Sequence, residues 1–328
     1  MADQLDVSVV ISTYNRCELL PKTLQSVLHQ EAGHLRYEVI IVDNNSTDRT
    51  REVVESWQAQ GHDNLRYVFE GRQGVSYGRN TGIAAARTPI VAFTDDDVFP
   101  SADWVARIAS ALHDYPEMDY VGGKSLAVTG TRFPRWLTGG SHWAPIAVID
   151  YGDSEITIDQ TNQLCLATCN LAFRREVFTR IQPFSPEFKR SEDYELQLRL
   201  WQAGGKGLYL PGLVVYTEVP PHRLTKRYHR EWNRIQGRER AMTRSEDVER
   251  SSARLFDVPA HMVRQAGIDV FGLLAETIRG RSDLAFAAET RLHFFGAFFR
   301  ERRKEFKRSS SAGDIQEILR FIRELRAR

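Results

Sequence analysis

The stretch "YEVIIVDNNSTDRTREVVESWQAQG", residues 37–61, decides the fold class of this chain. Residues 39–42 are an unbroken run of β-branched side chains, which is typical of a strand buried on both faces. The polar residues that follow suit a turn, and either Ser46 or Thr47 could cap a helix that closes at Gly61. A buried strand joined by a short loop to a helix predicts an α/β protein.

The same order of elements repeats on both sides of this stretch. Strands are predicted over 7–12, 65–70 and 89–95, and helices over 19–30 and 74–87. Continuous apolar strands that alternate with helices imply a mostly parallel sheet covered on both faces. Ligands bind such sheets beyond the carboxyl ends of the strands, so three polar segments are predicted to converge on one crevice. They are "STYNR" (12–16), "DNNSTD" (43–48) and "TDDD" (94–97).

Length and composition set broad limits. The 328 residues suffice for one large domain or a domain with an appendage, and 42% hydrophobic and 27% charged residues are ordinary for a soluble globular protein. A net charge of +1 gives no argument for a nucleic-acid partner, and three cysteines favour a reducing compartment. The first residues lack a secretory signal, and no apolar run approaches the ~20 residues that span a bilayer. We expect a cytoplasmic protein, with attachment to the inner face of the cell membrane left open.

Three adjacent carboxylates, Asp95, Asp96 and Asp97, end the predicted strand at 89–95. One interpretation is a solvated loop, with Ser101 and Asp103 capping the next helix. The other is that two alternating carboxylates hold a hard divalent cation. Mg²⁺ takes only one or two protein carboxylates and leaves positions for phosphate oxygens, so a cation could bridge this loop to a bound diphosphate.

Six segments in order resemble the motifs of the family-2 glycosyltransferases with a GT-A fold. They are "VSVVISTYNR", "VIIVDNNSTD", "GRNTGIAAA", "FTDDDVFP", "CNLAFRREVF" and "SEDYELQLRLWQAG". The resemblance implies a Rossmann-like, mostly parallel sheet sandwiched by helices. It also implies a catalytic domain over 1–235, with a nucleotide-binding half (1–121) and an acceptor-binding half (122–235). The remainder, 236–328, is expected to be a helical C-terminal extension.

For the donor, the resemblance implies contacts from ten residues: Ser12, Thr13 and Tyr14 at the base, Arg16 at the phosphates, Asp43 and Asn44 at the base edge, Arg79 and Asn80 at phosphate or ribose, and Asn170 and Glu192 in the pocket lining. Several have a plainer alternative, and Asp43 and Asn44 could simply form a turn. Tyr14 could be a half-buried aromatic, Arg79 a helix-surface charge, and Asn170 an amide that satisfies core backbone groups. Relatives often carry Asp-Asp-Gly-Ser where this chain has Asp43-Asn44-Asn45-Ser46, which leaves the base open, with a UDP-sugar expected first.

For the chemistry, the resemblance implies that Asp97 binds Mg²⁺ or Mn²⁺ directly, while Asp95 reaches the ribose or the metal. Asp96 is the middle residue of the motif, and His222 is a candidate third ligand that could equally be a surface histidine. Asp193 is the expected general base for a single displacement with inversion. The alternative is that Glu192 and Asp193 only favour the first turn of a helix.

The acceptor is expected to be a glycan or a lipid-linked sugar in polysaccharide or glycoconjugate synthesis. Trp136, His142 and Trp143 could stack on its rings, or could be core residues. A nicotinamide-dependent oxidoreductase or a nucleotidyltransferase would want a glycine-rich loop after the first strand, and "STYNRCELL" (12–20) has no glycine. A non-catalytic sugar-binding protein on the same fold has no need of a base such as Asp193.

The segment "RLHFFGAFFRERRKEFKR", residues 291–308, combines a phenylalanine face with many cations. On a helix, Phe295, Phe298 and Phe299 share one side. That side could lie on a membrane through residues 292–308, or could pack onto the protein or a second subunit. The sequence implies no oligomeric state.

Overall fold

The protein divides into two units, which are described separately. The computed structural model covers residues 6–128, 130, 132–137, 143–309 and 314–326. The first unit comprises Met1–Thr129 and Ala147–Val219, and the second comprises Gly130–Ile146 and Pro220–Arg328. The domain boundary that we place at residue 235 stays a prediction.

A large sheet forms the centre of the first unit, with strand order β3-β2-β1-β4-β8-β6-β9-β5 and β7 paired with β9. The strands β3, β2, β1 and β4 are parallel, as the sequence predicts. Beyond them the sheet is mixed, because β8 runs antiparallel between β4 and β6. The strands are β1 (Val7–Thr13), β2 (Tyr37–Asp43), β3 (Leu65–Phe69), β4 (Ile90–Asp95), β5 (Val98–Pro100), β6 (Tyr120–Val128), β7 (Ile156–Ile158), β8 (Leu171–Arg174) and β9 (Gly207–Glu218).

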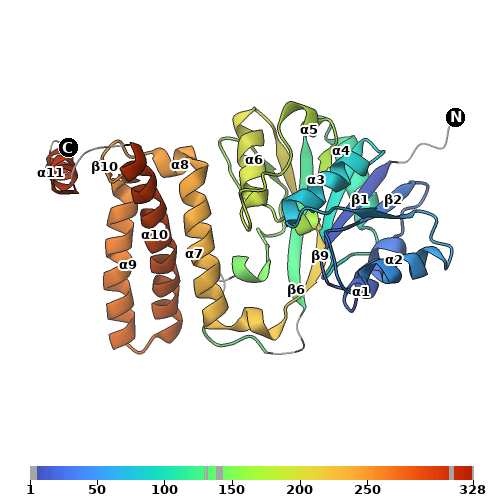
Figure 1. Ribbon diagram of the computed structural model, residues 1–328, viewed down its shortest axis with the longest axis horizontal. Coiled ribbons are helices and arrows are strands. Elements are labelled where there is room, and N and C mark those ends of the chain that lie inside the picture. The colour runs from blue at the N-terminus through green and yellow to red at the C-terminus, as the bar shows by residue number, and fades with distance from the viewer. Residues whose placement is uncertain (1–5, 129, 131, 138–142, 310–313, 327–328) are drawn as a thin grey trace. The chain divides into compact units, whose positions relative to one another are not determined.

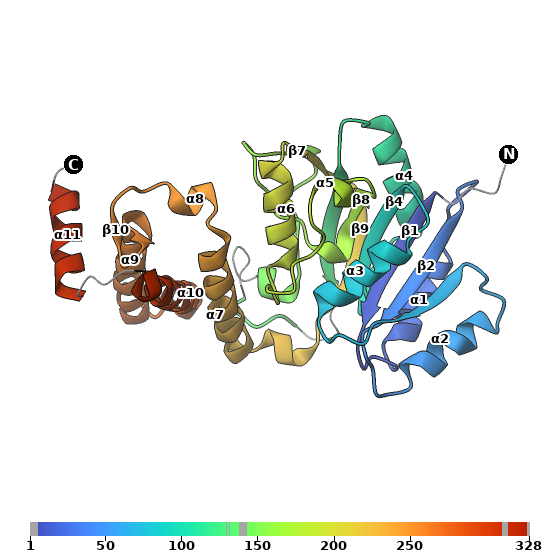
Figure 2. The same cartoon turned by 45° about the horizontal axis from the view of Figure 1, so that its top comes forward.

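Helices cover both faces of this sheet (Figures 1 and 2). On one face α1, α2 and α4 pack against Val9 and Ile11 of β1, and on the other α3, α5 and α6 pack against Val10 and its neighbours. Consecutive residues of a strand point to opposite faces, so the continuous apolar run of β1 serves both cores. The helices are α1 (Leu20–Leu28), α2 (Thr50–Gln58), α3 (Val75–Ala85), α4 (Trp104–Asp114), α5 (Val177–Arg180) and α6 (Glu192–Gln202), with the 3₁₀ turn η3 (Thr168–Asn170).

Two glycines let α3 lie directly against β1. A Cβ at Gly82 would come within 2.2 Å of Val10 Cγ1, and one at Gly78 within 2.0 Å of Ser12 Oγ. Any larger residue would therefore push the helix away from the strand. This close approach brings Arg79, between the two glycines, to the carboxyl end of the sheet.

The start of α2 differs from the prediction that Ser46 or Thr47 caps it. The Asp48 carboxylate instead accepts hydrogen bonds from the backbone N–H of Thr50 (3.0 Å) and of Cys17 (3.1 Å). One side chain thus satisfies a helix N-terminus and fixes the loop after β1 to the loop after β2. Burial would raise the pKa of Asp48, but hydrogen bonds from the Thr50 hydroxyl and from these two N–H groups hold it down at about 2.

The second unit is mainly helical, and α10 lies between α7 and α9 (Figure 1). Phe298 is fully buried and Phe295 nearly so, in a core shared with Met262 of α9 and Ala241 of α7. The expectation of membrane contact through the phenylalanine face of 292–308 is therefore wrong for these side chains, and the packing alternative is confirmed. The elements are η2 (Ala144–Ile146), η4 (Pro221–Leu224), α7 (Lys226–Thr243), α8 (Glu246–Glu249), β10 (Arg254–Leu255), β11 (Val258–Pro259), α9 (Ala260–Ile278), α10 (Ser282–Ser309) and α11 (Asp314–Arg326).

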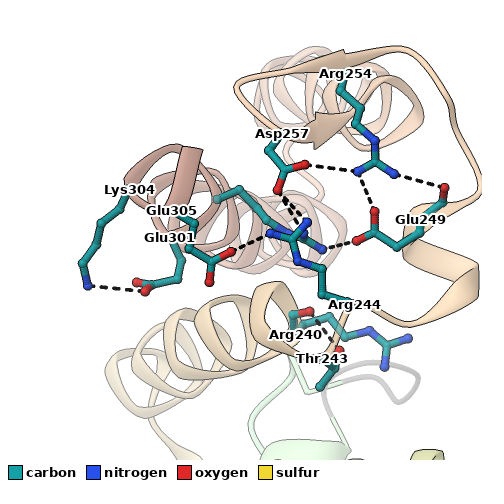
Figure 3. Close-up of polar contacts among 10 residues, drawn as sticks. Arg240, Thr243, Arg244, Glu249, Arg254, Asp257, Glu301, Lys304 and Glu305 are labelled. Carbon is teal, nitrogen blue, oxygen red and sulfur yellow. Dashed lines mark hydrogen bonds and ion pairs between the residues drawn. The ribbon is translucent and has the colours of Figure 1, made fainter. Parts of the chain in front are cut away.

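Ion pairs connect the ends of these helices. Arg244, at the end of α7, binds Asp257 at 2.6 Å and Glu305 of α10 at 2.7 Å (Figure 3). Arg302 of α10 is fully buried and donates to Asp257 (3.2 Å) and to Glu249 of α8. The network joins α7, α8, α10 and the β10–β11 turn. Among the helices in the described part of the chain, none is long and apolar enough to cross a membrane.

Candidate active site

The polar loops at the carboxyl ends of β1, β2 and β4 do converge. Thr13 of β1 lies in register with Asp43 of β2, and Ser12 lies opposite Asp95 of β4. Asn15 holds the first two loops together: its N–H donates to Ser46 Oγ (2.9 Å) and its Oδ1 accepts from Thr47 N (2.8 Å). Its φ of 52° is a left-handed conformation that asparagine tolerates better than most residues. Sequence reasoning missed this role.

Asp43 and Asn44 are buried and shape one wall of the site. Asp43 accepts hydrogen bonds from the Tyr67 hydroxyl (2.7 Å) and the Ser46 N–H (2.9 Å). Asn44 donates to the Arg72 carbonyl (2.6 Å) and accepts from the Gly74 N–H (2.7 Å). These contacts fix the loop that leads into α3, and a contact with a nucleobase edge stays a prediction for both residues.

Arg79 links two acidic segments that lie far apart in sequence. Its Nη1 donates to Glu192 Oε1 at 2.6 Å, and its Nη2 to Asp95 Oδ1 at 3.2 Å. Only 6% of Arg79 is exposed, so the helix-surface alternative is wrong. The second oxygen of Glu192, Oε2, is buried without a hydrogen-bond partner among the described residues. The arginine therefore brings the aspartate motif of β4 and the Glu192–Asp193 pair of α6 into one site.

Two predicted donor-binding amides bond mainly to backbone groups. Asn80 donates to the Phe184 carbonyl (2.8 Å) and accepts from the Phe184 N–H (2.9 Å). Asn170 donates to the carbonyls of Lys124 and Leu213 (2.9 Å each) and accepts from Trp104 Nε1 (2.7 Å). For Asn170 this geometry favours the structural alternative. For both residues a contact with the donor stays a prediction.

Asp193 lies in the first turn of α6, beside Glu192. Its Oδ1 accepts from the Tyr194 N–H (2.7 Å), and its carbonyl accepts from Gln197 Nε2 (2.9 Å). Burial, with the neighbouring Glu192 charge added, raises the pKa of Asp193 to about 7. A carboxyl group that titrates near neutral pH can accept a proton during turnover and release it afterwards.

Asp96 points inward from the acidic loop. It is 9% exposed, accepts a hydrogen bond from Thr13 Oγ1 (2.7 Å) and lies 4.0 Å from Arg16 Nε. Burial raises its pKa to about 7, although the Thr13 hydroxyl opposes this. Asp96 therefore links the loop after β4 to β1. Tyr14, 45% exposed, is one of the predicted base-pocket residues that remain open to solvent.

The acidic loop offers oxygen ligands of the kind that a hard divalent cation prefers. The Asp95 side chain is 41% exposed, and Asp97 follows two residues later. Within the described residues, no group of three His, Cys, Asp or Glu side chains could hold a metal by itself. A cation at Asp95 and Asp97 would therefore complete its shell with ligand and water oxygens, as Mg²⁺ commonly does. His222 is an exposed residue of η4 in the second unit, and its role as a ligand stays a prediction.

Tyr151 is a further candidate that no motif signals. It is 39% exposed, and its hydroxyl donates to the Cys165 carbonyl at 2.8 Å. Gln197, bonded to the Asp193 carbonyl, also contacts Cys165 Sγ at 3.7 Å. Burial, with smaller contributions that include the Asp193 charge, raises the pKa of Tyr151 to about 12. A half-exposed aromatic ring is thus held close to the base candidate.

The predicted acceptor aromatics belong to the second unit. Trp136 packs edge-on against His229 and Phe286, with ring centroids 4.9 Å apart in each case, so it serves the core there. Trp143 contacts Phe133 edge-on at 5.9 Å. His142 lies outside the described residues.

Comparison with known proteins agrees with this arrangement. The model of the family described as Glycosyl transferase family 2 matches residues 8–182, which is more than half of the chain. The chain belongs to glycosyl transferase family 2. Glycosyltransferase AglE of Haloferax volcanii is 31% identical over 199 residues, 60% of this chain and 62% of AglE. Validoxylamine A glucosyltransferase of Streptomyces hygroscopicus is 39% identical over 107 residues, 32% of this chain and 25% of that protein. These matches span less than two thirds of the relatives' own length.

Solved structures share the family's GT-A fold. TarS 1–349 of S. aureus in complex with UDP superposes with a TM-score of 0.54 at 17% identity, over 93% of this chain and 92% of TarS. The mannosyltransferase PcManGT of Pyrobaculum calidifontis, in complex with GDP-Man and Mn²⁺, superposes with a TM-score of 0.53 at 20% identity. The match covers 100% of this chain and 82% of the PcManGT chain. The expected fold class, an α/β GT-A sheet with a helical C-terminal region, is confirmed.

Proposed function

We propose that this family-2 protein transfers a sugar from a nucleoside-diphosphate donor to an acceptor hydroxyl, with inversion at the anomeric carbon. The observation that carries the proposal is the Arg79 bridge, at 3.2 Å to Asp95 and 2.6 Å to Glu192. The bridge brings together two groups. One is the pair of carboxylates at the end of β4, Asp95 and Asp97, which suits a cation. The other is the carboxyl group of Asp193 at the start of α6, which suits proton transfer. A metal-dependent inverting transferase needs both in one site.

The reaction is a single displacement. The acceptor hydroxyl oxygen bonds to the anomeric carbon as the bond from that carbon to the diphosphate oxygen breaks. Asp193 takes the hydroxyl proton, since the raised pKa of about 7 makes it a usable base near neutral pH. The diphosphate leaves with the bonding electron pair.

A divalent cation, Mg²⁺ or Mn²⁺, would be held by Asp97 and Asp95 and, when bound, would neutralise the charge of the leaving diphosphate. The oxygen-only donor set of these two side chains supports such an ion. The complexes of PcManGT and of GalNAc-T7 with Mn²⁺ support it as a property of proteins of this fold.

A UDP-sugar is the first donor to test, because TarS is described in complex with UDP and with UDP-GlcNAc. Because PcManGT is described in complex with GDP-Man, a GDP-sugar is the second donor to test. Tyr151 is proposed as a stacking surface for an acceptor sugar beside Asp193. A glycan acceptor is supported by relatives such as succinoglycan biosynthesis protein ExoM of Rhizobium meliloti, and a lipid-linked acceptor stays a prediction.

The test is hydrolysis of a panel of UDP- and GDP-sugars with Mn²⁺, with Mg²⁺ and with EDTA. We expect turnover of one donor that EDTA abolishes and added metal restores, and Asp97→Ala should lose both. Asp103→Ala is the matched control, because Asp103 is an acid that pairs with Arg107 on the surface of α4. Full turnover in EDTA would contradict the metal assignment. Metal-dependent binding of a donor without hydrolysis or transfer would favour the alternative function, a non-catalytic sugar-binding protein.

A further inference from the structure

The guanidinium group of Arg79 lies over an aromatic ring. Its Cζ atom is 5.4 Å from the centroid of the Phe184 ring, within the distance at which a cation is attracted to an aromatic face. Arg79 is 6% exposed and Phe184 is 1% exposed, so little water competes with this contact. The Nη1 and Nη2 atoms of the same guanidinium donate to Glu192 and Asp95. The ring therefore restricts the orientation of a planar group that reaches two carboxylates at once.

Phe184 also contacts the strand that carries Asp95. Its ring meets the Phe93 ring edge-on, with the centroids 5.5 Å apart. Phe93 lies two positions before Asp95 in β4, so the two side chains project from the same face of the sheet. One aromatic ring thus packs against Arg79 and against the strand whose last carboxylate Arg79 binds.

The position of Phe184 depends on side chains of α3. Residues 182–185 form neither helix nor strand. Asn80 Nδ2 donates to the Phe184 carbonyl (2.8 Å), and Asn80 Oδ1 accepts from the Phe184 N–H (2.9 Å). The amide thereby satisfies both backbone polar groups of one residue, as a neighbouring strand would. Ser76 Oγ donates to the carbonyl of Ser185 at 3.1 Å. The loop is thus fixed to the helix that carries Arg79.

A plainer explanation is that Asn80 only satisfies backbone groups of a loop. The geometry favours a more specific role, because the residue that Asn80 holds is the one whose ring faces Arg79. An arginine side chain has many rotamers, and a packed aromatic face selects among them. Both ends of the Asn80 amide are bonded to Phe184, so this role requires no contact between Asn80 and the donor.

We propose that Asn80 and Phe184 are positioning residues of the transferase site. Asn80 fixes Phe184, and the Phe184 ring holds the Arg79 guanidinium in the orientation that joins Asp95 to Glu192. The inference rests on the proposed function, because it is the transferase reaction that needs the two acidic segments together. Neither positioning residue touches the reacting atoms in this scheme.

Two variants of the full chain test the proposal. Phe184→Leu keeps a buried apolar side chain but removes the ring, and Asn80→Leu removes both hydrogen bonds to the loop. Turnover of the panel of UDP- and GDP-sugars with Mn²⁺ should fall at least about tenfold in each, because a misplacement of about 1 Å can cost 10²-fold. Melting curves set a temperature at which the variants are folded. Asn80 is only partly buried, so its variant gives the same test should Phe184→Leu fail to fold.

Phe173→Leu is the matched control. Phe173 is fully buried in the same core and stacks on Tyr120 with ring centroids 5.4 Å apart. Its loss should lower the melting temperature but leave turnover per folded molecule within about twofold. An equal loss of turnover in Phe173→Leu would assign the effect to general loosening of the core and would overturn the proposal.

A double-mutant cycle shows whether Phe184 acts through Arg79. In an Arg79→Lys background, Phe184→Leu should lower turnover by less than about twofold, because no planar guanidinium remains to be oriented. If Phe184→Leu costs as much turnover in that background as it does alone, the two residues act independently and the positioning role is wrong.

A measurement that needs no turnover separates this inference from the proposed function. In the NMR spectrum of the ¹⁵N-arginine-labelled chain, the Arg79 Nε–H signal is identified by its absence from Arg79→Lys. It should shift in Phe184→Leu and in Asn80→Leu, because an aromatic ring changes the shielding of nuclei near its face. An unchanged signal in Asn80→Leu, or full turnover in either variant, would overturn the proposal. If the unsubstituted chain turned over no donor, the proposed function would fail, and the Arg79 signal would still decide whether Asn80 and Phe184 position Arg79.

Discussion

Replacing Asp193 with asparagine should lower turnover sharply and stabilise the fold. Burial and the adjacent Glu192 charge raise the pKa of Asp193 from 3.8 to about 7, so the folded protein holds its charged form unfavourably. Asparagine has nearly the same shape, but it carries no charge and cannot accept the proton. The substitution therefore removes a catalytic group and an electrostatic cost at the same time.

The direction of the pH effect on stability follows from the linkage between proton binding and folding. A carboxyl whose pKa is higher in the folded than in the unfolded chain stabilises the fold least at high pH, so stability falls as pH rises from about 4 to about 7. At roughly 1.4 kcal/mol per pH unit, the full cost has an upper limit of about 4 kcal/mol. Asp193 keeps partial solvent exposure, so we expect Asp193→Asn to gain about 2 kcal/mol at pH 8 and almost nothing at pH 4. Turnover should fall by roughly 10²-fold or more.

Urea unfolding at pH 4, 6 and 8, and turnover across the same range, measure both effects. In the unsubstituted chain, turnover should rise with pH around 7, and this rise should be absent from the residual activity of the variant. Glu195→Gln is the control in the same helix. Its carboxylate pairs with Arg199 at 2.6 Å, so its loss should cost a little stability and leave turnover near normal. If Asp193→Asn were destabilised at pH 8, or kept full turnover, Asp193 would be a structural carboxylate.

Two further predictions concern buried and capping charges. Arg79→Met removes the cation that pairs with buried Glu192 at 2.6 Å, so the free energy of unfolding should fall by about 3–5 kcal/mol, with partial recovery in Arg79→Lys. Urea titration measures this change, and an unchanged midpoint would contradict the bridge. The pKa of Asp48 is lowered from 3.8 in the unfolded chain to about 2 in the folded protein. Its charged carboxylate therefore stabilises the fold at pH values above 3.8, and this contribution disappears as the pH falls towards 2. In melts between pH 6 and 2, Asp48→Asn should be less stable than the unsubstituted chain at pH 6, and the two should converge at pH 2.

The fold of the first unit could be predicted from sequence because its strands are short, apolar and bounded by polar loops. The strands 7–12, 65–70 and 89–95 became β1, β3 and β4 within about a residue or two. Their loops converged because parallel strands end at one edge of a sheet. The antiparallel position of β8 between β4 and β6 was not predictable, because a sequence of four residues does not reveal whether the strand runs parallel or antiparallel to its neighbours.

The roles of individual site residues were harder to predict, because their partners lie far away in the sequence. Arg79 and Glu192 are 113 positions apart, and Asn80 bonds the backbone of a residue 104 positions away. No feature of the neighbouring sequence distinguishes an arginine that bridges buried acids from an arginine on a helix surface. The α10 phenylalanines illustrate the same limit: periodicity identified one apolar face, but only packing decides whether protein or another surface covers it.

Two of the three adjacent aspartates, Asp95 and Asp96, have different partners, and this leads to the last prediction. Asp95 pairs with Arg79 at 3.2 Å, and Asp96 turns inward to Thr13 at 2.7 Å with Arg16 at 4.0 Å. The fold thus balances most of this charge from its own residues, and a cation bound with the donor would add to binding and turnover more than to folding. EDTA should therefore abolish donor turnover while shifting the melting temperature of the donor-free chain by less than about 1 °C. A large drop in melting temperature with EDTA, reversed by Mn²⁺ alone, would mean that the acidic loop needs its metal to fold.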